Sequence, residues 1–392
     1  MRYFHEWLLA MFAVMAAFQL GTVTAEFEMA LHGPYAYYTS SPILPRPWAS
    51  QFTTWFPNSG GILNNVSTGV CNLTLRDYRA AFQAPRGSPE ALKMLSICNR
   101  HEACVYAQLP PSVTLNYQGA SILLGLTPMI LSTLGPTIAE LALLSTHRPI
   151  LSLLISLGAP VYWVIRAFEF HDPRDAARGG RLVMGETSTS IAVLISAAQY
   201  VLAVMAAATV AFTMVETGRR TTLAWACTTP FAPLLWSSLA VLVNIVAAAS
   251  SLVIKRASKP EDRKRNKTSR NSRERCGGRR VASKCTFTPF WEAFCRVVGN
   301  ETTICANREG RYEGENEGEV PMLAMFLFVV AECMSFFFFL FGTAVFSALQ
   351  FVSFIDAFKR ILAPLIGSTI VCRLILLLEI AGLRRTSGVT VK

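Results

Sequence analysis

Residues 221–254 read TTLAWACTTPFAPLLWSSLAVLVNIVAAASSLVI, a run of 34 residues without a charged side chain. A helix needs about 20 mostly apolar residues to cross the hydrocarbon core of a bilayer, which is about 30 Å thick. The run therefore predicts a membrane-spanning helix. The composition agrees, because 52% of the 392 residues are hydrophobic and 16% are charged, whereas soluble domains carry about 25% charged residues. These features exclude a soluble enzyme and a disordered protein.

Five more apolar stretches lie before and after this run, at residues 118–139, 149–165, 187–215, 322–344 and 361–383. Together they predict an all-α integral membrane bundle of about six transmembrane helices. We expect helices 1–4 in residues 118–254, helices 5 and 6 in residues 320–383, and a tail in residues 384–392. Pro128 and Pro136 interrupt the first stretch, which is tolerated where neighbouring helices satisfy the freed backbone groups.

Small residues recur at every fourth position in two of these stretches, at Ala203, Ala207 and Ala211 and again at Ala240, Asn244 and Ala248. Such spacing lets helices approach one another closely in lipid. It predicts helix–helix contacts rather than a pore lining. Within the second set, we expect the Asn244 side chain to form a hydrogen bond to a neighbouring helix.

The first 25 residues predict a signal peptide. An apolar stretch from Trp7 to Phe18 has the length of a signal-peptide core. Val23 and Ala25 supply small residues at the −3 and −1 positions of a cleavage site. We expect cleavage after Ala25, and an uncleaved anchor helix is the alternative. Either outcome sends the next segment, residues 26–117, into the lumen of the secretory pathway.

Residues 26–117 predict a small lumenal domain that contains disulfides. Asn65 and Asn72 begin two glycosylation sequons, and Cys71, Cys98 and Cys104 lie in a compartment that favours disulfides. We assign Cys98 and Cys104 to disulfides. Since three is an odd number, one thiol stays free or pairs elsewhere. We favour a small core over a partner-binding face for the aromatic residues of this segment, Tyr35, Tyr37, Tyr38, Trp48, Trp55 and Phe56.

Residues 255–319 predict a long polar loop between helices 4 and 5. Lys255 to Arg280 contains 12 basic and 3 acidic residues, and therefore supplies +9 of the net charge of +11. Its composition predicts disorder, whereas Glu309 to Glu319 is acidic and Gly-rich. Asn266 and Asn300 begin two further sequons. Four cysteines lie about ten residues apart, unlike the Cys-x-x-Cys pairs of a zinc site, and we expect two disulfides among them: Cys276, Cys285, Cys295 and Cys305.

The charge distribution conflicts with a topology of six spans. Six spans behind a signal peptide place the loop at 255–319 outside, on the side of Asn65 and Asn72, and leave Arg219, Arg220, Lys359 and Arg360 inside. Cytoplasmic loops, however, carry the excess of Lys and Arg. In a five-span alternative the Pro-containing first stretch is re-entrant, which reverses the orientation of everything that follows. The sequence leaves both topologies open.

One series of short motifs carries a family resemblance. Leu123-Leu124-Gly125-Leu126-Thr127-Pro128 is followed by Leu134-Gly135-Pro136-Thr137-Ile138-Ala139-Glu140, and then by Arg148-Pro149 and Leu157-Gly158-Ala159-Pro160. This series resembles a run in uncharacterised polytopic membrane proteins of filamentous fungi, mainly over residues 118–160. Cys98 and Cys104 fit the same pattern. The resemblance implies a membrane fold and a secretory route, and it implies no activity.

Ionisable residues inside the apolar stretches are the best candidates for functional sites, because a charge at bilayer depth costs at least about 2.5–3.5 kcal/mol. Glu140, Glu332, Arg373 and Glu379 qualify. Glu332 and Arg373 lie at equal depth on consecutive antiparallel spans, which predicts an intramembrane ion pair between them. Glu140 and Glu379 are expected to reach the membrane interface.

The chain lacks the motifs of the common enzyme classes. It has no Gly-x-Ser-x-Gly elbow, no phosphate-binding loop, no dinucleotide fingerprint and no His-Glu-x-x-His. We therefore expect no enzyme, cofactor, metal or nucleic-acid partner. The favoured function is that of a non-enzymatic multi-pass protein of the secretory pathway and plasma membrane, which works in sensing, adhesion or assembly through a protein partner of its lumenal domain. The alternative is a transporter or channel for a small solute or ion that uses Glu332 and Arg373.

Overall fold

The computed structural model describes residues 51–84, 93–162, 189–225, 227, 229–273, 301, 304–305 and 321–386, with the backbone alone for 258–273 and 384–386. Several expectations lie outside these residues: the signal peptide, the acidic segment from Glu309 to Glu319, the side chain of Asn266, and Asn300, Cys276, Cys285 and Cys295.

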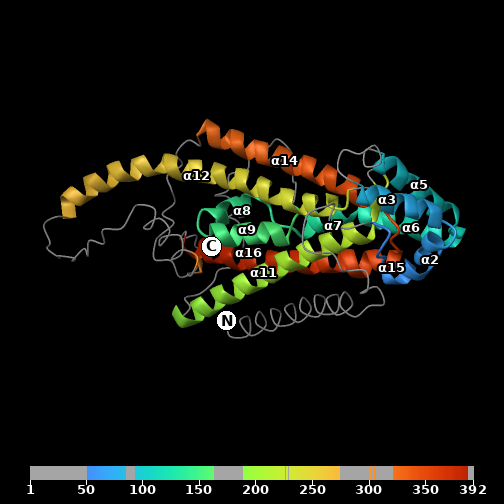
Figure 1. Cartoon of the computed structure of the whole chain (residues 1–392). Coiled ribbons are helices and arrows are strands. Elements are labelled where there is room, and N and C mark those ends of the chain that lie inside the picture. Colours follow the sequence, from blue (N-terminus) through green and yellow to red (C-terminus); the bar gives the residue numbers. More distant parts are fainter. Residues whose placement is uncertain are drawn as a thin grey trace.

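The described chain is almost entirely helical (Figure 1). Its elements are α2 (Pro57–Thr68), α3 (Asn72–Gln83), α5 (Met94–Ala107), α6 (Pro111–Gly125), α7 (Thr127–Leu134), α8 (Ile138–Ser145), α9 (Pro149–Gly158), α11 (Thr189–Arg220), β1 (Thr222–Leu223), α12 (Ala232–Arg273), α14 (Met322–Ser347), β2 (Leu349–Gln350), α15 (Phe354–Asp356), the π-helical turn η3 (Ala357–Leu362) and α16 (Ala363–Thr386).

Four helices in the described part of the chain are long and apolar enough to cross a membrane. They are Ser190–Arg220, Ala232–Ala257, Met322–Ser347 and Phe354–Leu383. Their outer faces expose large apolar side chains, such as Val201, Leu242 and Phe337. A soluble monomer rarely exposes so much contiguous apolar surface. The fold therefore fits an all-α protein that is embedded in a membrane, and four of the predicted apolar stretches form spanning helices.

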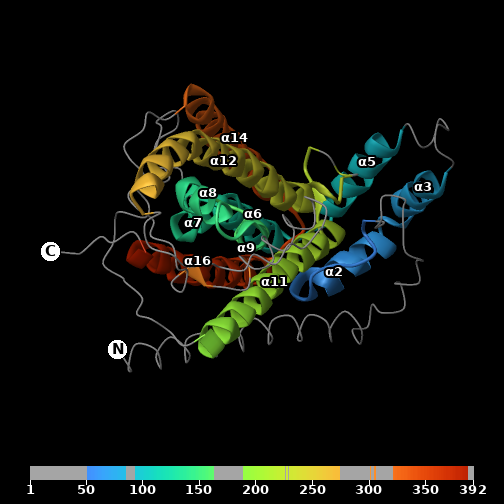
Figure 2. The same ribbon diagram turned by 90° about the vertical axis from the view of Figure 1, so that its left-hand side faces the viewer.

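The bundle has three layers, which Figure 2 shows end-on. Helices α12 and α14 pack together in one outer layer, and α11 and α16 pack together in the other. The short helices α6, α7, α8 and α9 lie between these pairs; α7, α8 and α9 contact both, and α6 contacts α14 and the turn η3 that leads into α16. Consecutive spans α14 and α16 are consequently held apart by the middle layer.

The middle layer departs from the predicted first two spans. The first stretch is broken before Pro128 and at Gly135-Pro136, so that it forms α6, α7 and α8 in place of one helix. A Cβ on Gly135 would lie 2.4 Å from the carbonyl oxygen of Val161, so this approach needs glycine. Helix α9 has ten residues and a length of about 15 Å, half of what a crossing needs. It turns back and ends beside the Gly135 break.

Helices α2, α3 and α5 form a layer at one end of the bundle, which we call the cap. The Cys98–Cys227 disulfide links the cap to the connection between α11 and α12. That connection also pairs with the one after α14, because β1 and β2 form a two-stranded antiparallel sheet with Thr222 opposite Gln350. The other end of the bundle, where α12 leaves it and α14 begins, is called the distal end below (Figure 1).

The predicted six-span topology placed Arg219, Arg220, Lys359 and Arg360 on the side opposite the N-terminal segment. In the structure the Arg220 guanidinium lies 5.5 Å from the ring centroid of Phe56, just before α2, and Arg360 pairs with Asp356 at the cap end. These contacts favour the five-span alternative, and the number of spans stays a prediction. The basic run is also more ordered than predicted, since α12 continues without a break to Arg273.

Small and polar residues join the layers. Asn244 Nδ2 donates to the carbonyl oxygen and to Oγ of Ser152 on α9, both at 3.3 Å, which confirms the predicted bond between helices. Ala240 is buried, and its carbonyl oxygen accepts from Tyr162 at 2.6 Å. On α11 Ala203 is buried and Ala211 is exposed, so the contact face follows only part of the predicted stripe.

Candidate functional site

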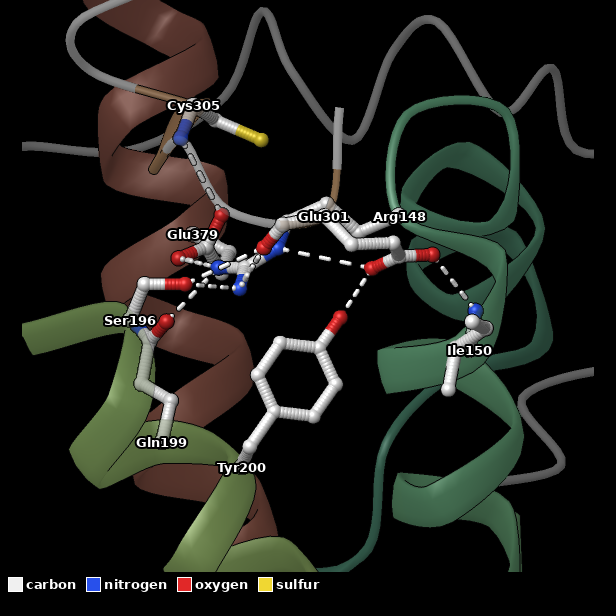
Figure 3. Close-up of polar contacts among 8 residues, drawn as sticks. All are labelled: Arg148, Ile150, Ser196, Gln199, Tyr200, Glu301, Cys305 and Glu379. Atoms are coloured by element: carbon white, nitrogen blue, oxygen red, sulfur yellow. Dashed lines mark hydrogen bonds and ion pairs between the residues drawn. The ribbon is translucent and has the colours of Figure 1, made fainter. Parts of the chain in front are cut away.

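Arg148, between α8 and α9, is the most densely bonded buried side chain at the distal end (Figure 3). Its Nη1 atom donates to Glu379 Oε1 on α16 and to Gln199 Oε1 on α11, both at 2.7 Å. Its Nη2 atom donates to Ser196 Oγ at 2.6 Å. A fully buried arginine is tolerated only with such partners, because an unpaired charge in this position costs several kcal/mol.

Glu301 brings a second carboxylate to the same arginine. One carboxylate oxygen, Oε2, lies 3.8 Å from Arg148 Nε and accepts the Tyr200 hydroxyl. The other, Oε1, accepts the backbone N–H of Ile150 at 2.8 Å. Ile150 is in the first turn of α9, where N–H groups have no partner within the helix and where the helix dipole favours an anion. The Arg148 guanidinium also lies 5.2 Å from the ring centroid of Tyr200.

The described part of residues 301–305, which we call the docked segment, belongs to the long polar loop. The carbonyl oxygen of Glu301 accepts from Arg148 Nη2 at 2.8 Å and from Ser196 Oγ at 3.1 Å. Ile304 packs against Ala192 of α11. Cys305 packs against Leu143 and Leu383, and its N–H donates to Glu379 Oε2 at 3.2 Å. The loop therefore returns to the bundle and covers Arg148.

The predicted pair of Glu332 and Arg373 is wrong. Arg373 Nη1 contacts the carboxylate of Glu140 on α8, and the two form an ion pair. Glu140 also completes a capping box with Thr137 at the start of α8. Glu332 is buried on α14, on the other side of the middle layer. The prediction assumed that consecutive spans pack together, and α6, α7 and α8 separate these two.

Glu140 and Glu379 were both expected to reach the membrane interface, and in the structure both side chains are mostly buried within the protein. Glu140 begins α8 inside the bundle, and its side chain is mostly buried. Glu379 is buried by the docked segment and Arg148. The distal half of the bundle thus contains two ion pairs that both join the α8–α9 hairpin to α16.

The cap contains a second buried polar group, formed around His101. Its Nδ1 lies 2.8 Å from Thr74 Oγ1 and its Nε2 lies 3.0 Å from Ser67 Oγ. Because the Thr74 hydroxyl already donates to the Cys71 carbonyl, we infer that Nδ1 carries the proton and that Ser67 donates to Nε2. Burial and the nearby Arg79 lower the pKa of His101 to about 4. The neighbouring Glu102 has a pKa that burial raises to about 7 against a hydrogen bond from Gln350.

Both cysteines that were predicted in cap disulfides are bonded. Cys104 pairs with Cys71, and Cys98 pairs with Cys227, each with a Cα–Cα distance of 6.0 Å. The odd thiol of residues 26–117 therefore has its partner in the connection between α11 and α12. The two disulfides among Cys276, Cys285, Cys295 and Cys305 stay a prediction.

Aromatic residues form the core of the cap, as expected for Trp55 and Phe56, which are buried. Phe351, from the turn after β2, inserts into this core and stacks on Tyr106 with ring centroids 4.7 Å apart. Its φ of 64° is unusual for a bulky residue and is maintained by the surrounding rings. Asn65 and Asn72 are exposed on the cap. Their glycosylation stays a prediction.

Asn300, predicted on the same side as Asn65 and Asn72, lies outside the described residues, so its side stays a prediction. The next residue, Glu301, is bonded at the distal end, whereas Asn65 and Asn72 belong to the cap.

Sequence reasoning missed Arg148 as a site residue. A signal was present, because Ser196, Gln199 and Tyr200 follow one another at intervals of three and one on one face of an otherwise apolar span. Such a polar face inside a membrane helix needs a partner. Among the described residues, no group of three or more His, Cys, Asp and Glu side chains is placed to hold a metal ion.

Comparisons of the chain with protein-family models, with curated proteins and with solved structures found no match. The resemblance to fungal membrane proteins therefore stays a prediction, and function has to be argued from the geometry alone.

Proposed function

We propose that this protein is a non-enzymatic membrane sensor, whose cap receives a signal on one side of the membrane and whose polar loop reports it on the other. One observation carries the proposal. Helices α11 and α16 pack against each other. At one end, Thr221 after α11 and Asp356 before η3 and α16 accept hydrogen bonds from Gln51 and Asn58 at the cap, and at the other end Tyr200 and Glu379 of the two helices bond the docked segment. A change in the position of the cap thus has a direct mechanical route to the loop.

The contacts at the cap end support this route. Gln51 Nε2, next to the cap, donates to the carbonyl oxygen of Thr221 at the end of α11 with a length of 3.3 Å. On α2 the backbone N–H of Asn58 donates to Asp356 Oδ2 at 3.2 Å, and the side-chain Nδ2 of Asn58 donates to Asp356 Oδ1 at 3.0 Å. Asp356 leads directly into η3 and α16. The cap is consequently fixed to both helices by hydrogen bonds as well as by the Cys98–Cys227 disulfide.

The contacts at the distal end complete the route. Ser196, Gln199 and Tyr200 of α11 and Glu379 of α16 hold Arg148 and the docked segment. A coupling through packed helices requires an element with two arrangements. We assign this role to the docked segment, which is bound by side-chain contacts to the bundle and belongs to a long loop.

The orientation follows from chemistry at the two ends. Two disulfides at the cap end call for an oxidising compartment, so we place the cap in the lumen or outside the cell. The distal end then faces the cytosol with the basic run from Lys255 to Arg280, as the excess of Lys and Arg in cytoplasmic loops requires. This orientation removes the conflict in the sequence. It also places Cys276, Cys285 and Cys295 in the cytosol, where disulfides are rare. This orientation and the two disulfides predicted among Cys276, Cys285, Cys295 and Cys305 therefore exclude each other. We place the protein in the plasma membrane, with a protein partner at the cap.

A transporter is the second candidate. Discontinuous helices in the middle of a bundle form the binding sites of many secondary transporters. The interrupted α6, α7 and α8, the half-length α9 and the ion pairs of Arg148 and Arg373 favour it. Against it, the core between the layers consists of large apolar side chains such as Trp236, Phe328 and Phe346.

Hydrogen exchange at Ile150 tests the proposed coupling. The N–H of Ile150 donates to Glu301, so its exchange rate reports whether the segment is docked. In the Cys98→Ser/Cys227→Ser variant in nanodiscs, we expect this rate to rise about tenfold, within the usual range of coupling between sites. The matched control is Cys71→Ser/Cys104→Ser, which removes the disulfide inside the cap and should leave Ile150 unchanged. An unchanged rate in the first variant contradicts the proposal.

A further inference from the structure

We propose that Arg148, Tyr200 and the first turn of α9 form a binding site for a carboxylate anion, and that Glu301 occupies it as an internal ligand. The site deepens the proposed function and rests on it for the release of the docked segment. When the segment leaves, the site is open at the distal end to a small carboxylate from solution.

The donors of the site match a carboxylate. Three groups from different parts of the fold converge on the two oxygens of Glu301 (Figure 3). The Ile150 N–H donates a hydrogen bond to one oxygen at 2.8 Å, and the Tyr200 hydroxyl donates to the other. Arg148 Nε lies 3.8 Å from that second oxygen and has no hydrogen-bond partner, although the side chain is fully buried. This buried donor points at an anion but lies too far from it for a hydrogen bond. A ligand that fits the site better would gain that hydrogen bond.

Of the two carboxylates beside Arg148, Glu301 is the exchangeable one. Glu379 belongs to a spanning helix and forms the close pair, with 2.7 Å between Oε1 and Nη1. Glu301 belongs to a loop and lies 3.8 Å from Nε. Its departure leaves Arg148 neutralised by Glu379, so the fold keeps no unpaired buried cation. The vacated donors still favour an anion, because the dipole of α9 ends there.

The described donors serve two oxygens, which favours a carboxylate over a phosphate group. Each carboxylate oxygen of Glu301 has one principal donor, and the Arg148 guanidinium and the Tyr200 ring close one side of the site. A third oxygen finds no further donor among the groups that hold the Glu301 carboxylate, whereas Arg148 Nη2 and Ser196 Oγ, which hold the Glu301 carbonyl oxygen, are vacated when the segment leaves. Phosphate is therefore an outcome that the experiment must distinguish.

Chemical rescue of the Glu301→Gly variant tests the site. The substitution removes the whole side chain, which is two carbons and a carboxylate, and propionate supplies the same heavy atoms. Propionate should slow the exchange of the Ile150 N–H by about tenfold at a concentration ten times its Kd, because an occupied site protects this donor in proportion to the ligand bound. It should also raise the melting temperature by about 2–4 °C. Propionamide, which is neutral and has nearly the same shape, should do neither.

Several results would overturn the proposal. Rescue by propionamide makes the site a cavity for any small polar molecule, and rescue by inorganic phosphate alone assigns it to phosphate. An equal effect of propionate on the wild-type chain means that it acts elsewhere. If Glu301→Gly does not fold, Glu301→Gln keeps the shape of the side chain and propionate should displace the amide, again protecting Ile150. No protection in either variant refutes the site. These measurements do not involve the cap. The Cys98→Ser/Cys227→Ser test of the proposed coupling can therefore fail while the binding site is confirmed, and the reverse.

Discussion

Arg148 and Glu379 are 231 residues apart in the chain, and their Nη1 and Oε1 atoms lie 2.7 Å apart in a buried ion pair at the distal end. This contact closes the hairpin of α8 and α9 against α16. Two groups of this kind are costly to bury separately, so the pair stabilises one packing of the middle layer against others.

Breaking this pair from one side should cost more than removing both partners. Arg148→Met leaves the buried carboxylates of Glu379 and Glu301 without their cation, and we expect it to lower the free energy of unfolding by about 3–5 kcal/mol. Arg148→Met/Glu379→Met should recover part of that loss. Denaturant unfolding in detergent measures both. Arg219→Met is the control, since the Arg219–Glu216 pair is partly exposed and should contribute less than about 1 kcal/mol. A double variant as unstable as Arg148→Met argues against the pair.

A double-mutant cycle should locate the partner of Arg373. Arg373 contacts Glu140, so Arg373→Gln and Glu140→Gln are expected to be non-additive by about 0.5–3 kcal/mol. Arg373→Gln and Glu332→Gln should add within about 0.5 kcal/mol, because the two residues are separated by the middle layer. Melting temperatures of the three single and two double variants provide the data. Additivity in the first cycle together with coupling in the second would restore the pair expected from the sequence.

Gly342 should be intolerant of a side chain. A Cβ there would lie 2.2 Å from Trp236 Nε1, and the Trp236 ring is held between Phe338 and Phe346. We expect Gly342→Ala to destabilise the pairing of α12 and α14 by about 1–3 kcal/mol. Gly61→Ala is the matched control, because it lies in helix α2 with open space around it. Alanine should stabilise that position by up to about 1 kcal/mol. Equal effects at the two glycines would contradict the packing described.

The stability of the cap should depend on pH through two opposing groups. Burial raises the pKa of Glu102 from 4.5 to about 7, so the folded cap keeps a proton that the unfolded chain releases. Glu102 therefore reduces stability as pH rises from about 4.5 to 7. Burial lowers the pKa of His101 from 6.5 to about 4. The unfolded chain then binds a proton that the folded cap does not, and stability falls as pH drops from 6.5 to about 4.

Glu102→Gln separates these two effects. The melting temperature of the variant should equal that of the wild type near pH 4. At pH 8 it should be higher than that of the wild type, because the variant has no buried carboxylate charge at this position. As the pH drops from 6.5 to 4 the melting temperature of the variant should fall, since of the two opposing groups only His101 is left. Scanning calorimetry at half-unit steps of pH measures both curves. A Glu102→Gln variant that is less stable than the wild type at pH 8 contradicts the buried carboxyl.

Much of the fold could be predicted from local sequence. Apolar runs of more than 20 residues identified α11, α12, α14 and α16, because the length of a spanning helix depends on bilayer thickness alone. The bond of Asn244 across helices was predictable for a similar reason, since a polar group in an apolar span needs a partner on another helix. The disulfide bonding of Cys98 and Cys104 followed from the expected compartment.

Features that depend on how distant segments meet could not be predicted. Nothing local distinguishes a helix of ten residues that turns back, such as α9, from a short crossing, and the orientation of all later loops depends on that one distinction. The pairing of Cys98 with Cys227 joins residues 129 apart. Arg148 is buried by residues from α11, α16 and the polar loop. These segments are distant in the sequence, so the sequence alone does not predict that this basic residue beside a turn is buried.

The central claim is that the cap and the docked segment face opposite sides of the membrane, with the cap in the oxidising compartment. Sealed microsomes with the cytosolic face outward test it most directly. We predict that added trypsin cleaves within Lys255 to Arg280, while N-glycans at Asn65 and Asn72 resist endoglycosidase until detergent opens the vesicles. If the basic run is protected together with those glycans, and is cut only after detergent, the two ends share one side and the account is wrong.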